Sequence, residues 1–181
     1  IRLIAAGRYT DAYLINWESN VFPGILGRTC DRPCEPACRR GRVEENNGAD
    51  PGKSRPEPVA ICRLKRVAAD FKDNNVQARL HEKLPPKAPR NGKRIACVGA
   101  GPASLTLARD LVPMGYHVTI FEADPKAGGF MRTQVPRFRL PESVIDEETN
   151  YILDLGVEFI GGRRIDSLKG LLAENYDAVF V

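Results

Sequence analysis

Three of the five cysteines in the sequence lie close enough along the chain to share one metal centre. Cys30, Cys34 and Cys38 have a C-x3-C-x3-C spacing, and Cys62 follows early in a predicted helix. Cysteine thiolates are soft ligands that suit iron–sulfur clusters and zinc. An iron–sulfur cluster held by these four thiolates is the interpretation we favour. A structural zinc site and a group of free buried thiols are the alternatives.

A glycine-rich turn in the second half of the chain predicts a dinucleotide site. It lies between a buried strand predicted over residues 94–98 and a helix that runs through Leu111. The first glycine allows a tight turn, the second leaves room for a pyrophosphate, and a small third residue lets helix and strand pack closely. The helix N-terminus offers N–H groups and a positive dipole end to phosphates. The expected cofactor contacts in this turn are Gly99, Gly101, Pro102, Ala103 and Ser104.

A carboxylate and a second glycine pair complete the predicted dinucleotide site. Glu122 ends the second predicted strand, where its carboxylate can accept hydrogen bonds from ribose hydroxyls. The segment with Gly128 and Gly129 favours FAD over a nicotinamide cofactor. Arg132 is a further candidate for contact with the flavin or its phosphates. A glycine-rich turn in some other α/β domain is the alternative.

Hydrophobic spacing divides the chain into two units. Apolar residues three and four apart predict helices over residues 1–19 and 59–72, with a loop rich in Gly, Pro, Asn and Arg over residues 20–58. The predicted fold class is α/β, with an all-α iron–sulfur domain followed by a Rossmann-like FAD-binding domain that is incomplete at its C-terminus. The predicted boundaries are residues 1–82 for the helical domain, 83–93 for a Pro-rich basic linker and 94–181 for the FAD-binding domain.

The composition excludes several classes of protein. The 181 residues are 43% hydrophobic with a formal net charge of +4, which predicts no nucleic-acid partner. No run approaches the roughly 20 continuous apolar residues of a membrane span. A cysteine cluster beside a nucleotide fold favours a reducing, cytoplasmic setting. Both ends of the sequence look truncated, and an acidic run at Asp146, Glu147 and Glu148 is expected on the solvated face of a helix.

The residues around both predicted sites resemble the glutamate synthase small (β) subunit family. The resemblance rests on the segment from Asn20 to Cys38, the turn at 99–105, Phe121-Glu122, the segment from Gly128 to Arg132, and the segment from Val135 to Asp146. It covers nearly the whole chain. It implies an N-terminal helical domain with a 4Fe–4S cluster and then an FAD domain. It also implies an NAD(P)H domain later in the family's full length.

One position departs from the family's pattern. Its members generally carry a Glu or Gln ligand on the helix predicted over residues 59–72, and the matching position here is Lys65, which as a cation cannot bind iron. Cys62 lies one turn earlier on nearly the same helix face, and we hypothesise that it takes over the ligand role. The family's upstream four-cysteine motif, which binds a second cluster, is missing here. Ligands can be exchanged between two such clusters, so Cys38 is alternatively assigned to that second cluster.

The motifs and the resemblance together predict an electron-transfer subunit with NAD(P)H, FAD and 4Fe–4S clusters as its redox groups. Flavin converts between two-electron and one-electron chemistry, so the protein supplies positioning and electrostatics, and no catalytic acid or base is expected. The expected partners are other redox subunits of a complex and a small-molecule nicotinamide donor or acceptor. The alternatives are a self-contained flavoenzyme that reduces a small molecule and a non-catalytic cluster and FAD module that serves assembly.

Overall fold

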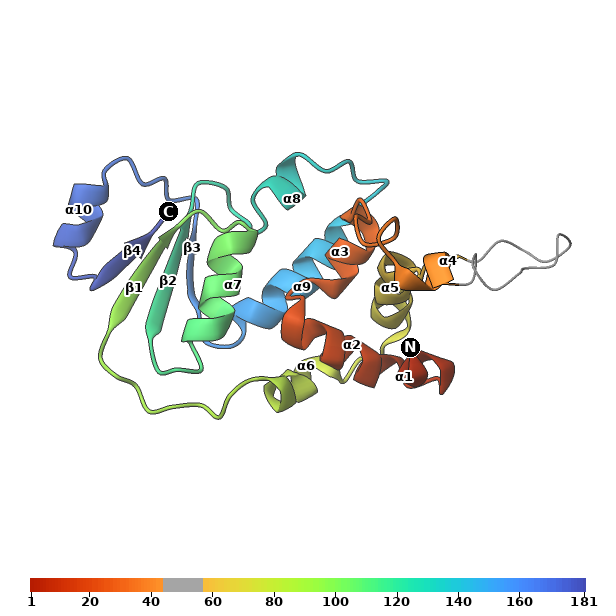
Figure 1. Cartoon of the computed structure of the whole chain (residues 1–181). Helices are drawn as coiled ribbons and strands as arrows, with labels where there is room; N and C mark the ends of the chain where they lie inside the picture. The colour runs from red at the N-terminus through yellow and green to blue at the C-terminus, as the bar shows by residue number, and fades with distance from the viewer. Residues whose placement is uncertain (44–56) are drawn as a thin grey trace, which may run out of the picture.

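The computed structural model of the chain describes residues 1–43 and 57–181. Helices form its N-terminal part, and a parallel sheet with flanking helices forms the rest, which confirms the predicted α/β class. Figure 1 shows the two parts side by side, with helix α9 (Glu142–Leu153) reaching from one to the other. Residues 44–56 of the predicted loop lie outside the described residues. Of the helices that are described, none is long and apolar enough to cross a bilayer.

Four parallel strands form the sheet in the order β3-β2-β1-β4. They are β1 (Arg94–Val98), β2 (His117–Glu122), β3 (Glu158–Gly161) and β4 (Ala178–Phe180). In this register Cys97 of β1 lies beside Ile120 of β2 and Phe180 of β4. Helix α7 (Pro102–Leu111) connects β1 to β2, as the sequence predicts. Because both strands are parallel, the turn after β1 and the end of β2 meet at one edge of the sheet.

Apolar side chains cover both faces of the sheet. On one face Cys97 and Ile120 pack in a cluster with residues of α7 and α9. On the other face Ala96 and Phe121 pack against Leu171 of helix α10 (Leu168–Ala173). Cys97 is fully buried, and burial raises the pKa of its thiol to about 11. This thiol therefore acts as a small packing residue.

The N-terminal part has more helices than the hydrophobic spacing predicts. The predicted helix over residues 1–19 is two helices, α1 (Arg2–Ala5) and α2 (Tyr9–Ser19), separated where Gly7 has a φ of +71°. Two further helices, α3 (Pro23–Thr29) and α4 (Arg39–Val43), lie in the region predicted to be loop. Pro23 gives α3 its start because the fixed φ of proline suits the first helical position. The remaining helices are α5 (Ile61–Phe71), close to the prediction over 59–72, α6 (Val76–Arg79) and the 3-10 helix η2 (Leu80–Lys83).

The predicted linker over residues 83–93 runs along the sheet part and bonds to it. The Ala88 N–H donates to the Pro113 carbonyl at 2.7 Å, and the Asn91 N–H donates to the Gly115 carbonyl at 3.1 Å. A Cβ on Gly115 would come within 2.2 Å of the Pro89 carbonyl oxygen, so only glycine permits this approach. The segment is therefore attached to the turn between α7 and β2.

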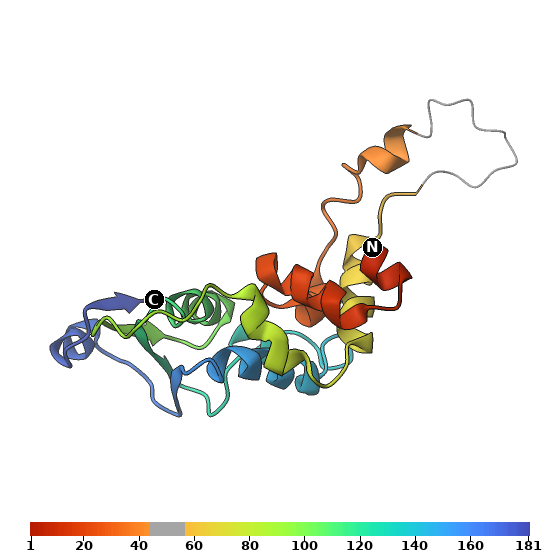
Figure 2. The same ribbon diagram turned by 90° about the horizontal axis from the view of Figure 1, so that it is seen from below.

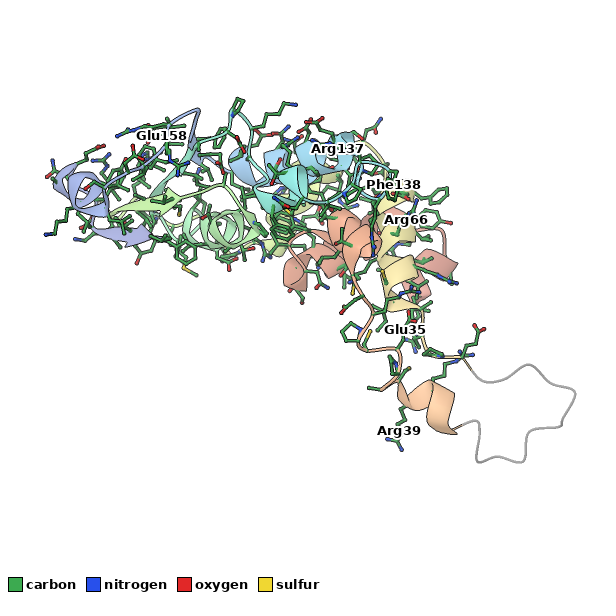
Figure 3. All side chains as sticks on the ribbon, turned by 90° about the horizontal axis from the view of Figure 1, so that it is seen from above. Glu35, Arg39, Arg66, Arg137, Phe138 and Glu158 are labelled. Carbon is green, nitrogen blue, oxygen red and sulfur yellow. The ribbon has the colours of Figure 1, made fainter. Side chains whose placement is uncertain are left out.

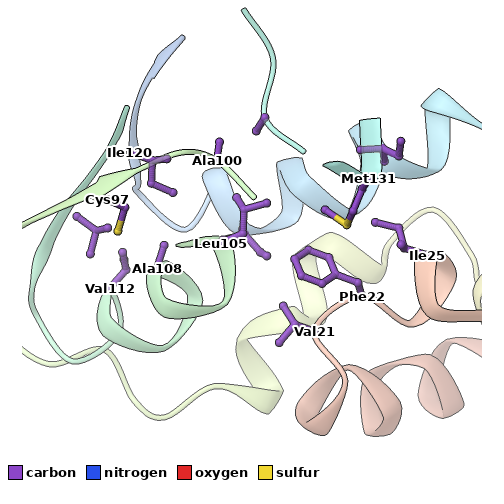
Figure 4. Close-up of a cluster of buried hydrophobic side chains, with 14 of the residues drawn as sticks. Val21, Phe22, Ile25, Cys97, Ala100, Leu105, Ala108, Val112, Ile120 and Met131 are labelled. Carbon is purple, nitrogen blue, oxygen red and sulfur yellow. The ribbon is translucent and has the colours of Figure 1, made fainter. Parts of the chain in front are cut away.

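The helical part and the sheet part share one continuous core. Val21, Phe22 and Ile25 belong to the same buried cluster as Leu105 of α7 and Met131 (Figure 4). A second cluster joins the side chains of α2, α5 and α9, with Tyr13, Trp17, Ala68 and Tyr151 among its members. Seen from below in Figure 2, α2, α3 and α5 gather beside α9, while α4 projects from the body. α3 thus packs against the sheet part as well as against α5.

Candidate functional site

The turn at residues 99–104, which we call the fingerprint loop, lies at the carboxyl edge of the sheet. The Gly99 N–H donates to the Phe121 carbonyl at 2.7 Å, and Gly99 has a φ of +91°, which glycine adopts without strain. A Cβ built on Gly99 or on Gly101 would meet no atom within 4 Å, so the surface above both is open. α7 begins at Pro102 directly behind this opening. The loop thus presents an open helix N-terminus, the setting that binds phosphates.

Glu122 lies against the fingerprint loop. Its Oε2 accepts a hydrogen bond from the Ala100 N–H at 2.7 Å, and its Oε1 accepts one from the Asp124 N–H at 3.1 Å. The side chain is half-buried at the end of β2, where the sequence predicts it. A carboxylate has about four lone-pair sites, so acceptor capacity remains after these two bonds. Glu122 therefore orders the loop and remains able to accept from ribose hydroxyls.

The glycine pair at 128–129 packs directly on the fingerprint loop. The Gly128 N–H donates to the Ala100 carbonyl at 2.9 Å. Gly129 has a φ of +50°, and a Cβ there would lie 2.9 Å from the Gly101 Cα. Both the conformation and the close approach require glycine. The structure therefore brings the fingerprint loop, Glu122 and the glycine pair together in one place.

Two of the predicted cysteine ligands, Cys30 and Cys62, lie side by side. Cys62, in the first turn of α5, is buried, and its Sγ donates to the Gly27 carbonyl of α3 at 3.3 Å. Burial raises the pKa of the Cys62 thiol, and the neighbouring Cys30 thiol raises it further. Cys30 follows the last residue of α3. Two thiols from distant parts of the chain therefore lie where α3 packs against α5.

The other two cysteines belong to the segment that leads away from α3. The Sγ of Cys38 accepts the Val59 N–H at 3.4 Å, and backbone donors lower the pKa of this thiol. Cys34 is exposed, and Figure 3 shows Glu35 and Arg39 on the same projecting segment. Within residues 1–43 and 57–181, no three Cys, His, Asp or Glu side chains are close enough together to hold a metal ion. The thiols fit an iron–sulfur centre by their chemistry. Cys30 and Cys62 already lie side by side, and Cys38 bonds the backbone of Val59, two residues before α5 begins.

Comparison with known proteins assigns both regions. Residues 1–77 match the family model for dihydropyrimidine dehydrogenase domain II, 4Fe-4S cluster, and residues 97–168 match an NAD(P)-binding Rossmann-like domain. The chain is 32% identical over 181 residues to the glutamate synthase [NADPH] small chain of Mycobacterium tuberculosis, covering 98% of this chain and 33% of the relative. Over nearly its whole length the chain is similar to the small chains of glutamate synthase.

Other relatives carry the names of different redox systems. The chain is 36% identical over 203 residues to the NADP(+)-dependent formate dehydrogenase subunit beta of Moorella thermoacetica, covering 100% of this chain and 27% of that protein. It is 33% identical over 187 residues to the NADPH-Fe(3+) oxidoreductase subunit beta of Geobacter sulfurreducens, covering 100% of this chain and 25% of that protein. The chain therefore spans about a quarter to a third of the length of these relatives.

Arg132, predicted to contact the cofactor, has protein partners for each guanidinium nitrogen. Its Nε donates to the Ala127 carbonyl at 2.9 Å, and its two terminal nitrogens bond Glu142 at 2.6 Å and Asp146 at 2.5 Å. The side chain is buried to 9% exposure in this arrangement. The guanidinium therefore ties helix α8 (Phe130–Thr133) to the start of α9, and its contacts do not favour a direct role at the flavin.

Glu148 is buried, although the acidic run that contains it was expected to face solvent. Asp146 and Glu147 are partly exposed, but Glu148 is 1% exposed and bonds to residues of α2 and α3. Helical spacing explains this, since Glu148 follows Ile145 by three residues and precedes Ile152 by four. A carboxylate on the apolar face of α9 was the signal available in the sequence.

Proposed function

We propose that the chain carries an FAD site and a 4Fe–4S site of an NAD(P)H-linked oxidoreductase subunit, and that electrons pass between them to or from a partner redox subunit. One observation carries this proposal. The segment 128–139 contacts the fingerprint loop at one end, where the Gly128 N–H donates to Ala100, and α3 at the other, where the Arg139 Nε donates to the Arg28 carbonyl at 3.0 Å. The two candidate sites are thus joined by one short stretch of chain.

The proposed FAD site uses the open N-terminus of α7. Backbone N–H groups at Ala103 and Ser104, beside Gly99 and Gly101, would hold the pyrophosphate, and Glu122 would accept from the ribose. The glycine pair at 128–129 keeps side chains away from this loop. When bound, FAD supplies the exchange between hydride and single-electron chemistry. The protein's own contribution is to bind and orient, because residues 99–104 carry no acidic or basic side chain.

The proposed cluster site uses Cys30, Cys34, Cys38 and Cys62. Cys30 and Cys62 would be held by the packing of α3 on α5, and the other two by the segment that follows. Buried surroundings around Cys62 limit solvent access, which is one means by which a protein sets cluster potential. Thiolate ligands call for a reducing compartment, so we propose a cytoplasmic location. Residues 1–82 and 94–181 serve as the cluster and FAD units, joined by residues 83–93.

Anaerobic purification of the full-length protein tests this proposal. Flavin, iron and zinc are measured per chain, and visible spectra are recorded before and after addition of NADH or NADPH. We expect flavin and iron, with cluster absorbance bleaching after the nicotinamide is added. Zinc without iron would show that the cysteines hold a structural zinc ion and not an iron–sulfur cluster. Flavin turnover of a small molecule without cluster reduction would favour a self-contained flavoenzyme, and protein without flavin or iron would favour an assembly module.

A further inference from the structure

Glu148 lies where the helical part meets the sheet part. Its Oε1 accepts hydrogen bonds from the Gly24 N–H at 2.7 Å and the Tyr13 hydroxyl at 2.8 Å, and its Oε2 accepts one from the Ile25 N–H at 2.9 Å. Gly24 and Ile25 belong to the first turn of α3, whose preceding residue Phe22 provides no side-chain cap. The carboxylate from α9 thus satisfies N–H groups that the helix itself leaves without acceptors.

The start of α3 is shaped for this carboxylate. A Cβ on Gly24 would lie 3.0 Å from the Glu148 Oε1, so a larger residue would push the two apart. Further along, a Cβ on Gly27 would lie 2.8 Å from the Arg66 backbone nitrogen, which shows how closely α3 approaches α5. α3 is therefore fixed at its start by α9 and along its side by α5.

The far end of α3 carries the candidate cluster ligand. Cys30 caps the C-terminus of this helix, and its N–H donates to the Leu26 carbonyl at 3.1 Å. The Cys62 thiol donates to the Gly27 carbonyl of the same helix. Because α3 has only 7 residues, a change in the placement of its first turn is carried to Cys30. The position of both thiols therefore depends on how α3 is held.

The same segment of α9 also contacts the dinucleotide region. The Asp146 carboxylate bonds Arg132 at 2.5 Å, and the Ile145 side chain lies 3.1 Å from where a Cβ on Gly128 would be. Gly128 in turn bonds the fingerprint loop. Residues 145–148 of α9 thus touch both the turn beside the fingerprint loop and the first turn of the cysteine-bearing helix.

We propose that Glu148 is a positioning residue for electron transfer, which holds α3 and its cysteines at a fixed placement relative to the dinucleotide site. The inference rests on the proposed function, because it concerns the step between the two cofactors. Replacing the carboxylate slows the passage of electrons from one site to the other. Reduction of the flavin by the nicotinamide is left unchanged, because Glu148 touches neither the fingerprint loop nor Glu122.

The test compares Glu148→Gln with wild type in the full-length protein. Stopped-flow spectra after mixing with NADPH or NADH separate flavin reduction from cluster reduction. We expect flavin reduction within about twofold of wild type and cluster reduction slower by on the order of tenfold, since small misplacements have large effects on rate. Hydrogen exchange should rise in residues 22–30 and stay unchanged over β1, a readout that needs no turnover. Flavin and iron contents are measured alongside and are expected to match wild type.

The matched control is Glu147→Gln. Glu147 neighbours Glu148 on the same helix and also reaches the helical part, bonding Lys72 at 2.9 Å, but it does not touch α3. We expect both half-reactions to stay near wild type in this variant. If Glu148→Gln does not fold, Tyr13→Phe removes a single hydrogen bond from the carboxylate and should give a smaller slowing of cluster reduction alone.

The outcomes separate the two proposals. The first outcome is that the wild-type cluster is reduced and that Glu148→Gln and Tyr13→Phe reduce it at the same rate. This would overturn the role of Glu148 and leave the proposed function standing. Equal slowing of both half-reactions, or the same slowing in Glu147→Gln, would also overturn it, because the effect would be general. Wild-type protein without flavin, iron or cluster reduction would overturn the proposed function and this inference with it.

Discussion

Helices α7 and α3 both begin with proline, and neither receives a cap from the side chain of its preceding residue. Their N-termini nonetheless face different surroundings. The start of α7 opens onto space that a Cβ on Gly101 would not fill, whereas the start of α3 is occupied by the buried carboxylate of Glu148. In α3 the free N–H groups are bonded by a side chain of the protein itself, and in α7 we propose that a cofactor phosphate bonds them. The open end is thus the proposed binding site, and the occupied end joins two parts of the fold.

The largest effect should come from closing the open helix end. Gly101→Val puts a side chain where no protein atom lies within 4 Å, at a φ of −77° that any residue adopts. We expect FAD affinity to fall at least about a hundredfold, equivalent to about 3 kcal/mol, with little change in thermal stability. Flavin titration and thermal unfolding measure the two effects. Gly170→Val on α10 is the control, because a Cβ there meets only Ser167 at 3.6 Å. Tight FAD binding by Gly101→Val would remove the contrast between the two helix ends.

Removing the Glu148 carboxylate from the start of α3 should lower the stability of the fold rather than the affinity for FAD. Glu148→Ala leaves two backbone N–H groups and the Tyr13 hydroxyl without their acceptor. We expect the free energy of unfolding to drop by about 3 kcal/mol. Urea unfolding followed by the fluorescence of Trp17, the single tryptophan of the sequence, measures this. Glu147→Ala breaks a partly exposed ion pair with Lys72 and should lower the unfolding free energy by under about 1 kcal/mol. Equal effects of the two substitutions would contradict a special role for the α3 terminus.

The occupied helix end should also respond to pH. Burial raises the pKa of the Glu148 carboxyl from 4.5 to about 7, against the lowering effects of the Gly24 and Ile25 N–H groups, Tyr13 and Lys72. The folded protein therefore holds this proton more tightly than the unfolded chain. The resulting stability is fully present below pH 4.5 and is lost as pH rises through 7, about 3 kcal/mol in all.

This loss is measured as a difference between two proteins. The unfolding free energies of wild type and Glu148→Gln are compared from pH 4 to pH 8. The wild-type value minus the variant value should decline with rising pH, because the substituted side chain at position 148 does not titrate. Glu147 and Tyr151, the other titratable groups of α9 near this carboxyl, are present in both proteins and cancel. A difference that is flat or rises with pH would show that Glu148 is ionised throughout.

The smallest effect should come from trimming one hydrogen bond. Tyr13→Phe removes the donor to the Glu148 Oε1 and keeps the ring in its buried cluster. We expect a loss of about 1 kcal/mol in unfolding free energy. Because this hydroxyl lowers the pKa of Glu148, its removal should also move the pH-dependent loss to higher pH. A shift to lower pH would show that the hydroxyl does not donate to the carboxylate.

Local patterns predicted the open helix end, and distant contacts decided the occupied one. Strand β1, the fingerprint loop and α7 follow each other in the chain, so glycine spacing and hydrophobicity were enough to find them and Glu122. The helix α3 contains Gly24 and Gly27, which favoured a loop until the contacts with Glu148 and Arg66 were known. Arg132 was predicted from its closeness to the glycine pair, but its acidic partners lie on α9. The proximity of Cys30 to Cys62 likewise depends on the packing of α3 against α5, which the sequence alone does not reveal.

The shared core has a consequence for how this helical part can be exchanged between proteins. Phe22 and Ile25 are buried against residues of the sheet part, and Tyr13 is buried beside Tyr151 of α9. Cutting the chain in the segment 83–93 and fusing the first piece to an unrelated dinucleotide domain would expose these apolar side chains and leave the start of α3 without its acceptor. A chimaera that is to remain folded must therefore take α9 along with the helical part, although α9 begins only at Glu142, far downstream of the cut.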